Sequence, residues 1–140
     1  MQSSDNTADP FAPEMRSAIM AKVSSKDTAP ELRVRSLLFR SGFRFRLHQR
    51  HLPGSPDIVL KKHNAAVFVH GCFWHGHNCR SGMRRPKANA DYWAAKLDRN
   101  MTRDRDACAR LEAAGWTVHV VWACQLEEDT KRVIAALRAQ

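Results

Sequence analysis

The sequence predicts an α/β fold, a single domain in which helices flank a mixed central β-sheet. Three observations predict it. The 140 residues match one domain, since domains usually contain roughly 100 to 200 residues. Hydrophobic residues make up 44% of the chain, which is enough for a packed core. Apolar spacings typical of helices and strands follow the order helix, helix, strand, strand, strand, helix, strand, helix, which suggests one sheet with helices against its faces.

The first part of the chain predicts a tail and a short helix. Residues 1–13 are polar and contain two prolines, so we expect a flexible N-terminal tail ahead of a folded domain at 14–140. Residues 14–23 place apolar side chains at helical spacing, which predicts a first helix.

The next segment predicts a helix followed by a strand. Thr28 and Glu31 have the spacing of a capping box, so a second helix should begin there and end at Gly42. Residues 43–47 alternate apolar side chains with arginine. This pattern is typical of a half-buried strand with its arginines toward solvent.

The middle of the chain predicts a hairpin and a long loop. Residues 57–60 and 65–69 are apolar runs separated by the polar segment 61–64, which favours two strands joined by a turn. Residues 70–89 are rich in Gly, His, Cys and Arg, and we expect them to form a loop.

The last part of the chain predicts a helix, a strand and a helix. A long helix should run from about residue 91 to 114 and end at Gly115. Residues 116–122 then predict a buried strand, and residues 127–139 predict an amphipathic helix.

Charge indicates a polyanionic partner. Lys and Arg number 23 against 14 Asp and Glu, for a net charge of +9, which favours nucleic acid or an anionic membrane. The longest apolar stretch, 65–69, is far too short to span a bilayer, and the N-terminus has no basic and apolar leader. We therefore expect no membrane association, a cytoplasmic location, and cysteines that are thiols or metal ligands.

One loop carries a candidate metal site. Cys72, His77 and Cys79 lie within eight residues, a density that suits Zn²⁺ if a fourth ligand comes from elsewhere. We assign this ligand to Cys124, which lies just beyond the last predicted strand, and not to Cys108 within the long helix. Four protein ligands predict a structural zinc. The alternative is a group of unrelated thiols beside a surface histidine.

A second set of residues suits acid–base and metal chemistry. Asp57 begins a predicted strand, where it could hold Mg²⁺ or simply end a turn. Asp104 falls on an apolar row of the long helix and needs a partner such as a histidine. Either His70 or His75 could deprotonate a water, and each could instead be structural. Glu31 already has a capping role.

Aromatic and basic segments suggest contact with DNA. Phe73 and Trp74 are bulky residues in a polar loop. They could fill the core or, with Trp93, enter a base stack as a wedge. The basic segments 33–50 and 80–87 could then neutralise phosphates beside the wedge.

Four motifs carry a resemblance to a known family. They are LPGSPDIV, VFVHGCFWHGHNC, NMTRDRD and VVWAC. In this order they resemble the very short patch repair (Vsr) DNA mismatch endonucleases, from about Met15 to Cys124. The resemblance implies a branch of the PD-(D/E)xK nuclease fold that nicks double-stranded DNA at a T:G mismatch left by deamination of 5-methylcytosine. It also implies Mg²⁺ for the chemistry and Zn²⁺ for the structure.

The resemblance also implies roles for the catalytic residues. Asp57 would be the central Mg²⁺ ligand together with the backbone carbonyl of Val69, and Glu31 would be an outer acidic residue of that site. His75 resembles the general base, oriented by Asp104, which decides between the two candidate histidines.

Other positions would contact the DNA. His70 would lie beside the scissile phosphate. The residues that intercalate next to the mismatch or clamp the opposite groove would be Phe73, Trp74, Trp93, Met20 and Val23. We expect a monomer whose candidate partners, besides DNA, are other mismatch-repair proteins. Two alternatives stay open: a zinc-braced DNA-binding module without catalysis, and a nuclease of the same fold with relaxed specificity.

Overall fold

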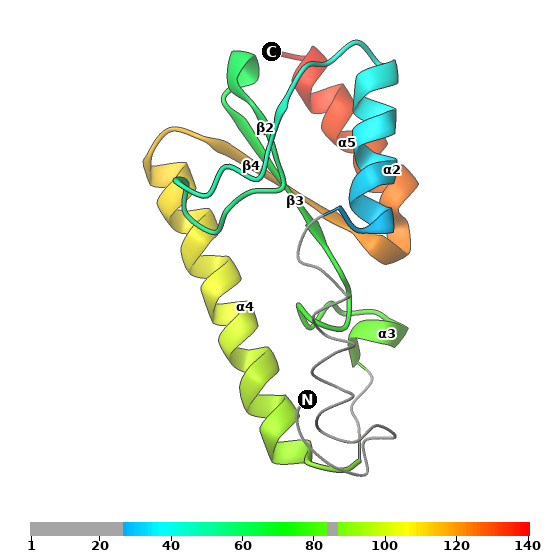
Figure 1. The fold of residues 1–140 in the computed structure, drawn as a ribbon, viewed down its shortest axis with the longest axis vertical. Coiled ribbons are helices and arrows are strands. Elements are labelled where there is room, and N and C mark those ends of the chain that lie inside the picture. The colour runs from blue at the N-terminus through cyan, green and yellow to red at the C-terminus, as the bar shows by residue number, and fades with distance from the viewer. Residues whose placement is uncertain (1–26, 84–86) are drawn as a thin grey trace.

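The fold is described from a computed structural model, in which the described residues are 27–83 and 87–140 (Figure 1). The predicted tail 1–13 and the predicted helix 14–23 lie outside them. The described residues form an α/β structure with a mixed four-stranded sheet.

The sheet has the strand order β1-β2-β3-β4. Its strands are β1 (Arg46–Leu47), β2 (Ile58–Leu60), β3 (Ala65–His70) and β4 (Thr117–Trp122). β1 pairs antiparallel with β2, β2 antiparallel with β3, and β3 parallel with β4. The hairpin predicted for 57–60 and 65–69 is therefore confirmed, with the short 3-10 helix η1 (Lys61–His63) in its turn.

Helices cover both faces of the sheet. α2 (Ala29–Arg40) and α5 (Leu126–Arg138) lie side by side on one face, and α4 (Ala90–Ala113) lies on the other (Figure 1). The N-terminal part of α4 extends past the sheet, and the short helix α3 (Arg80–Met83) lies beyond the same edge (Figure 1). No helix of the described residues has both the length and the apolar composition that crossing a bilayer requires.

Two apolar clusters hold these layers together. The larger lies between the sheet and the pair α2 and α5, and contains Val34, Leu38, Phe43, Ile58, Leu60, Ala65, Val67, Val121, Val133 and Leu137. The smaller, under α4, is built on Ala66, Phe68 and Leu111. β3 supplies both clusters because its side chains alternate between the two faces, so the strand that ends at His70 is central to the core.

The observed elements differ from the sequence predictions in three places. The strand predicted at 43–47 is reduced to two residues, since β2 is only three residues long and His48 takes a left-handed backbone conformation (φ 48°). The predicted loop 70–89 contains α3. β4 is less buried than predicted because it lies at the edge of the sheet, and Val121 is buried while its neighbours are half-buried or exposed.

The loop between β1 and β2 packs closely on α4. Gly54 has a φ of +74°, and a β carbon there would lie 2.6 Å from the Ala107 β carbon and 3.2 Å from the Phe68 ring. Only glycine permits this backbone conformation together with this approach. The contact fixes the loop on α4 just before Asp57, the first of the candidate site residues.

Candidate active site and metal centre

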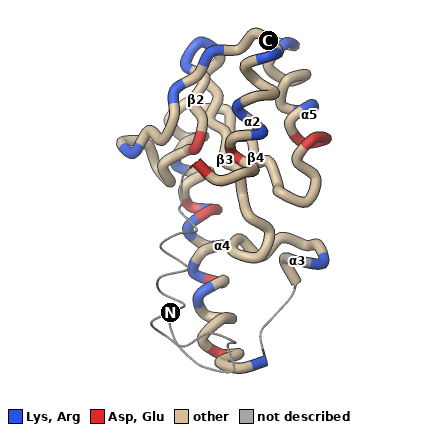
Figure 2. The backbone as a smooth tube through the Cα atoms, turned by 45° about the vertical axis from the view of Figure 1, so that its right-hand side comes forward, with Lys and Arg blue, Asp and Glu red and all other residues tan. Residues whose placement is uncertain are grey.

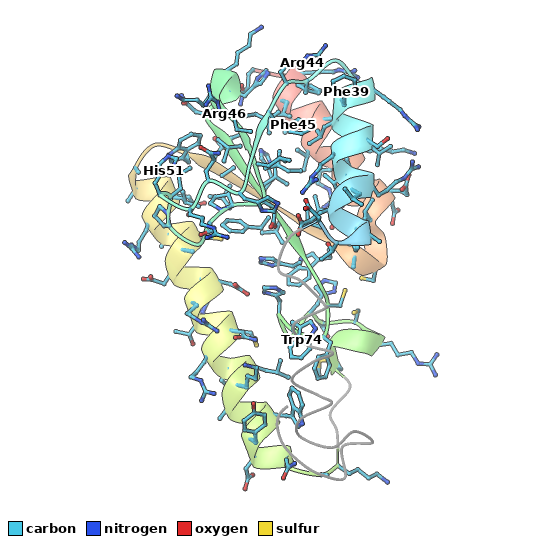
Figure 3. All side chains as sticks on the ribbon, in the orientation of Figure 1. Phe39, Arg44, Phe45, Arg46, His51 and Trp74 are labelled. Atoms are coloured by element: carbon cyan, nitrogen blue, oxygen red, sulfur yellow. The ribbon has the colours of Figure 1, made fainter. Side chains whose placement is uncertain are left out.

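The candidate residues gather where β3 and β4 end. These strands are parallel and in register, with His70 opposite Trp122, so the segments that leave them start at the same edge of the sheet. In Figure 3, Trp74 lies beyond this edge, whereas Arg44 and Arg46 lie at the other end of the molecule.

The first site is a cysteine and histidine cluster that could bind a metal. The ligand atoms of Cys72, His77, Cys79 and Cys124 all lie within 4.8 Å of one another, and the Cys124 Sγ is 3.4 Å from the His77 Nδ1. The structure therefore brings together the four residues that the sequence grouped. Cys108 is outside the cluster and is half-buried in α4.

Close packing of α3 shapes this cluster. A β carbon at Gly82 would overlap the backbone carbonyl of His77, so α3 can approach the loop only through a glycine. The Gly82 N–H donates to the Cys79 sulfur at 3.4 Å, and the His77 ring stacks on Trp122 at 4.1 Å.

The thiols of this cluster interact, and the pKa values of Cys79 and Cys124 move in opposite directions. The Gly82 N–H is the main reason that the pKa of Cys79 is lowered to about 7. The pKa of Cys124 is instead raised to about 12, first by desolvation and then by the thiols of Cys72 and Cys79. A divalent cation would relieve the repulsion at Cys124, and sulfur with imidazole is the donor set that zinc prefers. The residues therefore fit a metal ion.

The second site centres on Asp57, which precedes β2. The Val69 N–H donates to the Asp57 Oδ2 at 2.7 Å, so the carboxylate faces the end of β3. Burial raises the pKa of Asp57 to about 7, and the nearby Glu31 carboxylate raises it further against the Val69 hydrogen bond. The charges of His75 and Arg35 oppose this rise but do not cancel it, and a divalent metal ion bound at the carboxylate would stabilise its charged form.

Glu31 has both a capping role and a place near Asp57. The Thr28 hydroxyl accepts from the Glu31 N–H at 3.3 Å, as the predicted capping box requires. The Glu31 carboxylate accepts from the N–H of Asp27 at 3.1 Å, one residue earlier than that motif specifies. Its side chain is almost completely buried, so its charge acts on Asp57 with little screening.

His70, His75 and Asp104 form a compact group. The His75 Nδ1 lies 2.5 Å from an Asp104 carboxylate oxygen, which confirms that the inward-facing Asp104 has a histidine partner. His70 stacks on His75 with ring centroids 3.8 Å apart. Burial, together with His75, lowers the pKa of His70 to about 4, so His70 is neutral at physiological pH. A cavity of about 430 Å³ borders all three side chains.

The aromatic residues predicted to contact DNA form a cluster of their own. The Phe73 ring lies 5.0 Å from Trp74 and 5.7 Å from Trp93, and the two tryptophan rings are 5.8 Å apart. Met20 and Val23, predicted to contact the same DNA, lie outside the described residues.

The sequence did not reveal the roles of Asn100 and Asp129, two polar residues that hold the segments after β3 and β4. The Asn100 side chain donates to the Trp74 carbonyl at 2.9 Å. The Asp129 carboxylate, 2% exposed, accepts from the Trp122 N–H at 3.0 Å and so fixes the chain just before Cys124. Asp129 follows two exposed glutamates in the sequence and looked like part of a solvated acidic run. No local signal distinguishes it from them.

Comparison with known proteins decides the family. The family model of the DNA mismatch endonuclease Vsr matches residues 8–81, more than half of the chain. The chain belongs to the Vsr family. A Vsr relative, "Type II nicking enzyme V.XorIIP" from Xanthomonas oryzae, is 52% identical over 86% of this chain and 88% of its own length. "Type II nicking enzyme V.NmeAIP" from Neisseria meningitidis is 46% identical over 85% of this chain and 84% of its own.

A third Vsr relative carries the family name itself. "DNA mismatch endonuclease Vsr" of Escherichia coli K12 is 39% identical over 87% of this chain and 78% of its own length. The chain is therefore a DNA mismatch endonuclease and an endodeoxyribonuclease, whose substrate is DNA. Membership in a nuclease family also suggests a divalent metal.

The Vsr site makes a prediction about stability and pH. The raised pKa means that folded Asp57 keeps its proton from about pH 4 to about pH 7 while the unfolded chain loses it, so folding stability falls as the pH rises through that range. With no metal ion at Asp57, we expect Asp57→Asn to stabilise the protein at pH 8 by on the order of 2 to 4 kcal/mol, the value of two to three pKa units, and to have little effect at pH 4.

Urea unfolding of both proteins at the two pH values measures this difference. Asp98→Asn, at an exposed position of α4, is the matched control and should change neither value. A wild-type protein as stable as Asp57→Asn at pH 8 would show that the folded site does not oppose the charge on Asp57.

Proposed function

We propose that this chain nicks double-stranded DNA at T:G mismatches left by deamination of 5-methylcytosine, in very short patch repair, with Mg²⁺ and a histidine general base. One observation carries the proposal. In a member of the mismatch endonuclease family, Asp57 and the linked pair His75 and Asp104 lie at the same end of β3. The nicking activity named for the relatives supports it.

The fold proposed for this activity is the PD-(D/E)xK type. It is supported by the mixed sheet and by Asp57, which follows Pro56 at the start of β2. An acidic residue on the preceding helix, Glu31, also faces this strand.

Asp57 and the Val69 carbonyl are proposed to hold Mg²⁺, with Glu31 as an outer acidic residue of the same site. Carboxylate and carbonyl oxygens are the ligands that Mg²⁺ prefers, and the raised pKa of Asp57 indicates a place for positive charge. When bound, Mg²⁺ supplies neutralisation of the charge that develops on the phosphate and on the leaving oxygen. Asp57 is oriented for this by the Val69 N–H.

His75 is proposed to take the proton of the attacking water. Because Asp104 accepts the hydrogen on Nδ1, the Nε2 of His75 is left as a proton acceptor. His70 cannot share this role equally, since it has no carboxylate partner among the described residues and its Nδ1 has no hydrogen-bond partner there. We propose that His70 instead contacts the scissile phosphate as a neutral donor.

DNA binding is proposed to involve the basic surface and the aromatic cluster. Lys and Arg are spread over α2, α4 and the loops near β2 (Figure 2), where they can contact phosphates. Phe73, Trp74 and Trp93 lie together beside the catalytic residues, and aromatic or apolar side chains of this kind unstack bases as wedges. T:G specificity is assigned to this cluster.

The cysteine cluster is proposed to bind a structural zinc. We expect about one zinc per chain in the purified protein, and its loss in Cys124→Ala, with a large drop in melting temperature because zinc binding can contribute on the order of 10 kcal/mol to folding. Elemental analysis and thermal unfolding measure both. Cys108→Ala, outside the cluster, should keep its zinc. Full zinc content in Cys124→Ala would remove Cys124 from the ligand set.

The catalytic proposal is tested on matched duplexes with T:G or C:G at one position. Wild type should nick only the T:G duplex and only with Mg²⁺. We expect Asp57→Ala to lower the rate by at least about 10³-fold and His75→Ala by about 10² to 10⁴-fold, the range for loss of a general base. His63→Ala is the control, since His63 bonds Gln140 at the far end of β3.

The rival functions predict different results in the same assay. Equal nicking of both duplexes would indicate a nuclease with relaxed specificity. Tight binding to T:G without nicking would indicate a DNA-binding module, and would refute the catalytic roles of Asp57 and His75.

The wedge has a separate test. Replacing Phe73 and Trp74 by Ala should abolish the preference for T:G while leaving most of the salt-dependent binding to duplex DNA, because phosphate contacts supply that binding. Competition binding at several salt concentrations measures both. Phe39→Ala, an exposed aromatic 58% accessible on α2, is the control. A double variant that still prefers T:G, with its zinc retained, would refute the wedge.

A further inference from the structure

A second polar cluster lies beside Asp57, at the start of α2. The possible ligand atoms of Asp27, Glu31 and His48 all lie within 4.8 Å of one another, an arrangement that on its own resembles a metal site. The guanidinium of Arg35 lies among them. Its Nη2 is 2.6 Å from the Asp27 carboxylate, 3.2 Å from the Glu31 carboxylate and 3.0 Å from the His48 Nε2.

Arg35 therefore occupies the position that a cation would take in this cluster. Its side chain is 15% exposed and that of Glu31 3% exposed, and the Arg35 Nε is buried without a hydrogen-bond partner among the described residues. Desolvation of a guanidinium costs free energy that can exceed the gain from ion pairs such as those with Asp27 and Glu31. A gain in stability alone therefore does not explain the placement of Arg35, whereas an effect on the neighbouring Asp57 site can.

The cluster is coupled to Asp57 in two ways. His48 lies directly across from Asp57, whose carbonyl accepts the His48 N–H at 3.3 Å. Glu31 and Arg35 both act on the Asp57 carboxylate through their charges, in opposite directions. Arg35 thus fixes the Glu31 carboxylate of the proposed Mg²⁺ site and lies within electrostatic range of the Asp57 carboxylate.

We propose that Arg35 is a positioning residue of the nuclease site, which holds the Glu31 carboxylate toward Asp57 and supplies a fixed positive charge that weakens Mg²⁺ binding there. This inference rests on the proposed Mg²⁺ site at Asp57. If Arg35 only stabilised the fold, its removal would loosen the site and weaken metal binding. If Arg35 acts as proposed, its removal takes away a repelling charge and strengthens metal binding, while the Glu31 carboxylate is no longer held in place and the reaction slows.

The experiment compares Arg35→Met with wild type in two measurements. Binding of Mn²⁺, as a spectroscopic probe for Mg²⁺, is measured by electron paramagnetic resonance on the zinc-loaded protein without DNA. Nicking of the T:G duplex is measured at saturating Mg²⁺. We expect Mn²⁺ to bind about five- to tenfold more tightly, as removal of one nearby charge allows. We expect nicking to fall by about ten- to a hundredfold, the cost of a displaced group.

Two further variants control for charge and for folding. Arg35→Lys keeps the charge without the forked donor geometry, so it should restore wild-type Mn²⁺ affinity and recover only part of the nicking rate. Arg138→Met removes an exposed arginine at the end of α5, which donates to the Ser41 carbonyl, and should change neither quantity.

Three outcomes would contradict the inference. Unchanged or weaker Mn²⁺ binding in Arg35→Met, when Asp57→Asn abolishes binding, overturns the role of Arg35 and leaves the proposed metal site standing. If the double variant Arg35→Met, Asp57→Asn still binds Mn²⁺ more tightly, the ion lies among Asp27, Glu31 and His48 and not at Asp57. This result also overturns the role of Arg35. Wild-type Mn²⁺ binding that Asp57→Asn leaves intact would overturn the metal site, and the inference with it.

Discussion

Parallel pairing of β3 with β4 brings together residues that lie far apart in the sequence. Because His70 lies opposite Trp122, the loop that leaves β3 and the turn that leaves β4 begin at the same edge, and Cys124 reaches Cys72 and its neighbours. Parallel strands need a long crossover, and here α4 provides it. The same helix delivers Asp104 to His75. One strand pairing thus assembles both the cysteine cluster and the histidine and aspartate pair.

The carboxylates at the site are opposite in sign to the net charge of the chain. In a protein with a net charge of +9, the pKa of Asp57 is nevertheless raised, first by burial and then by the nearby Glu31 carboxylate. Basic side chains on the outer surface are screened by solvent and act weakly at that depth. Arg35, whose side chain is 15% exposed, acts on Asp57 from within the structure. The bulk charge suits contact with a polyanion, whereas Glu31 and Arg35 act in opposite directions on the Asp57 carboxylate, where a cation is proposed to bind.

Features that depend on neighbouring residues could be predicted from the sequence, whereas features that depend on contacts between distant segments could not. The capping residue Thr28, the hairpin and the cysteine spacing follow from neighbours in the sequence, and Cys124 could be placed from its position after a strand. Arg33 and Arg35 show the limit. Both lie on one helix, yet Arg33 is exposed against Glu127 and Arg35 is buried among three partners. The packing of the β1–β2 connection on α2 makes that difference, and no periodicity in the sequence encodes it.

The aromatic cluster links the metal centre to the proposed recognition of DNA. Phe73 and Trp74 follow Cys72 directly in the chain, and Asn100 anchors the Trp74 carbonyl to α4. A wedge must overcome a stacking free energy of a few kcal/mol per base step, and a loop that first had to become ordered would add to that cost. The proposed metal coordination at Cys72 would restrain the loop on one side of Phe73, and the hydrogen bond from Asn100 restrains it on the other. Under the proposed zinc and wedge roles, the cysteine cluster would therefore contribute to recognition as well as to folding, because it would fix the backbone from which the rings project.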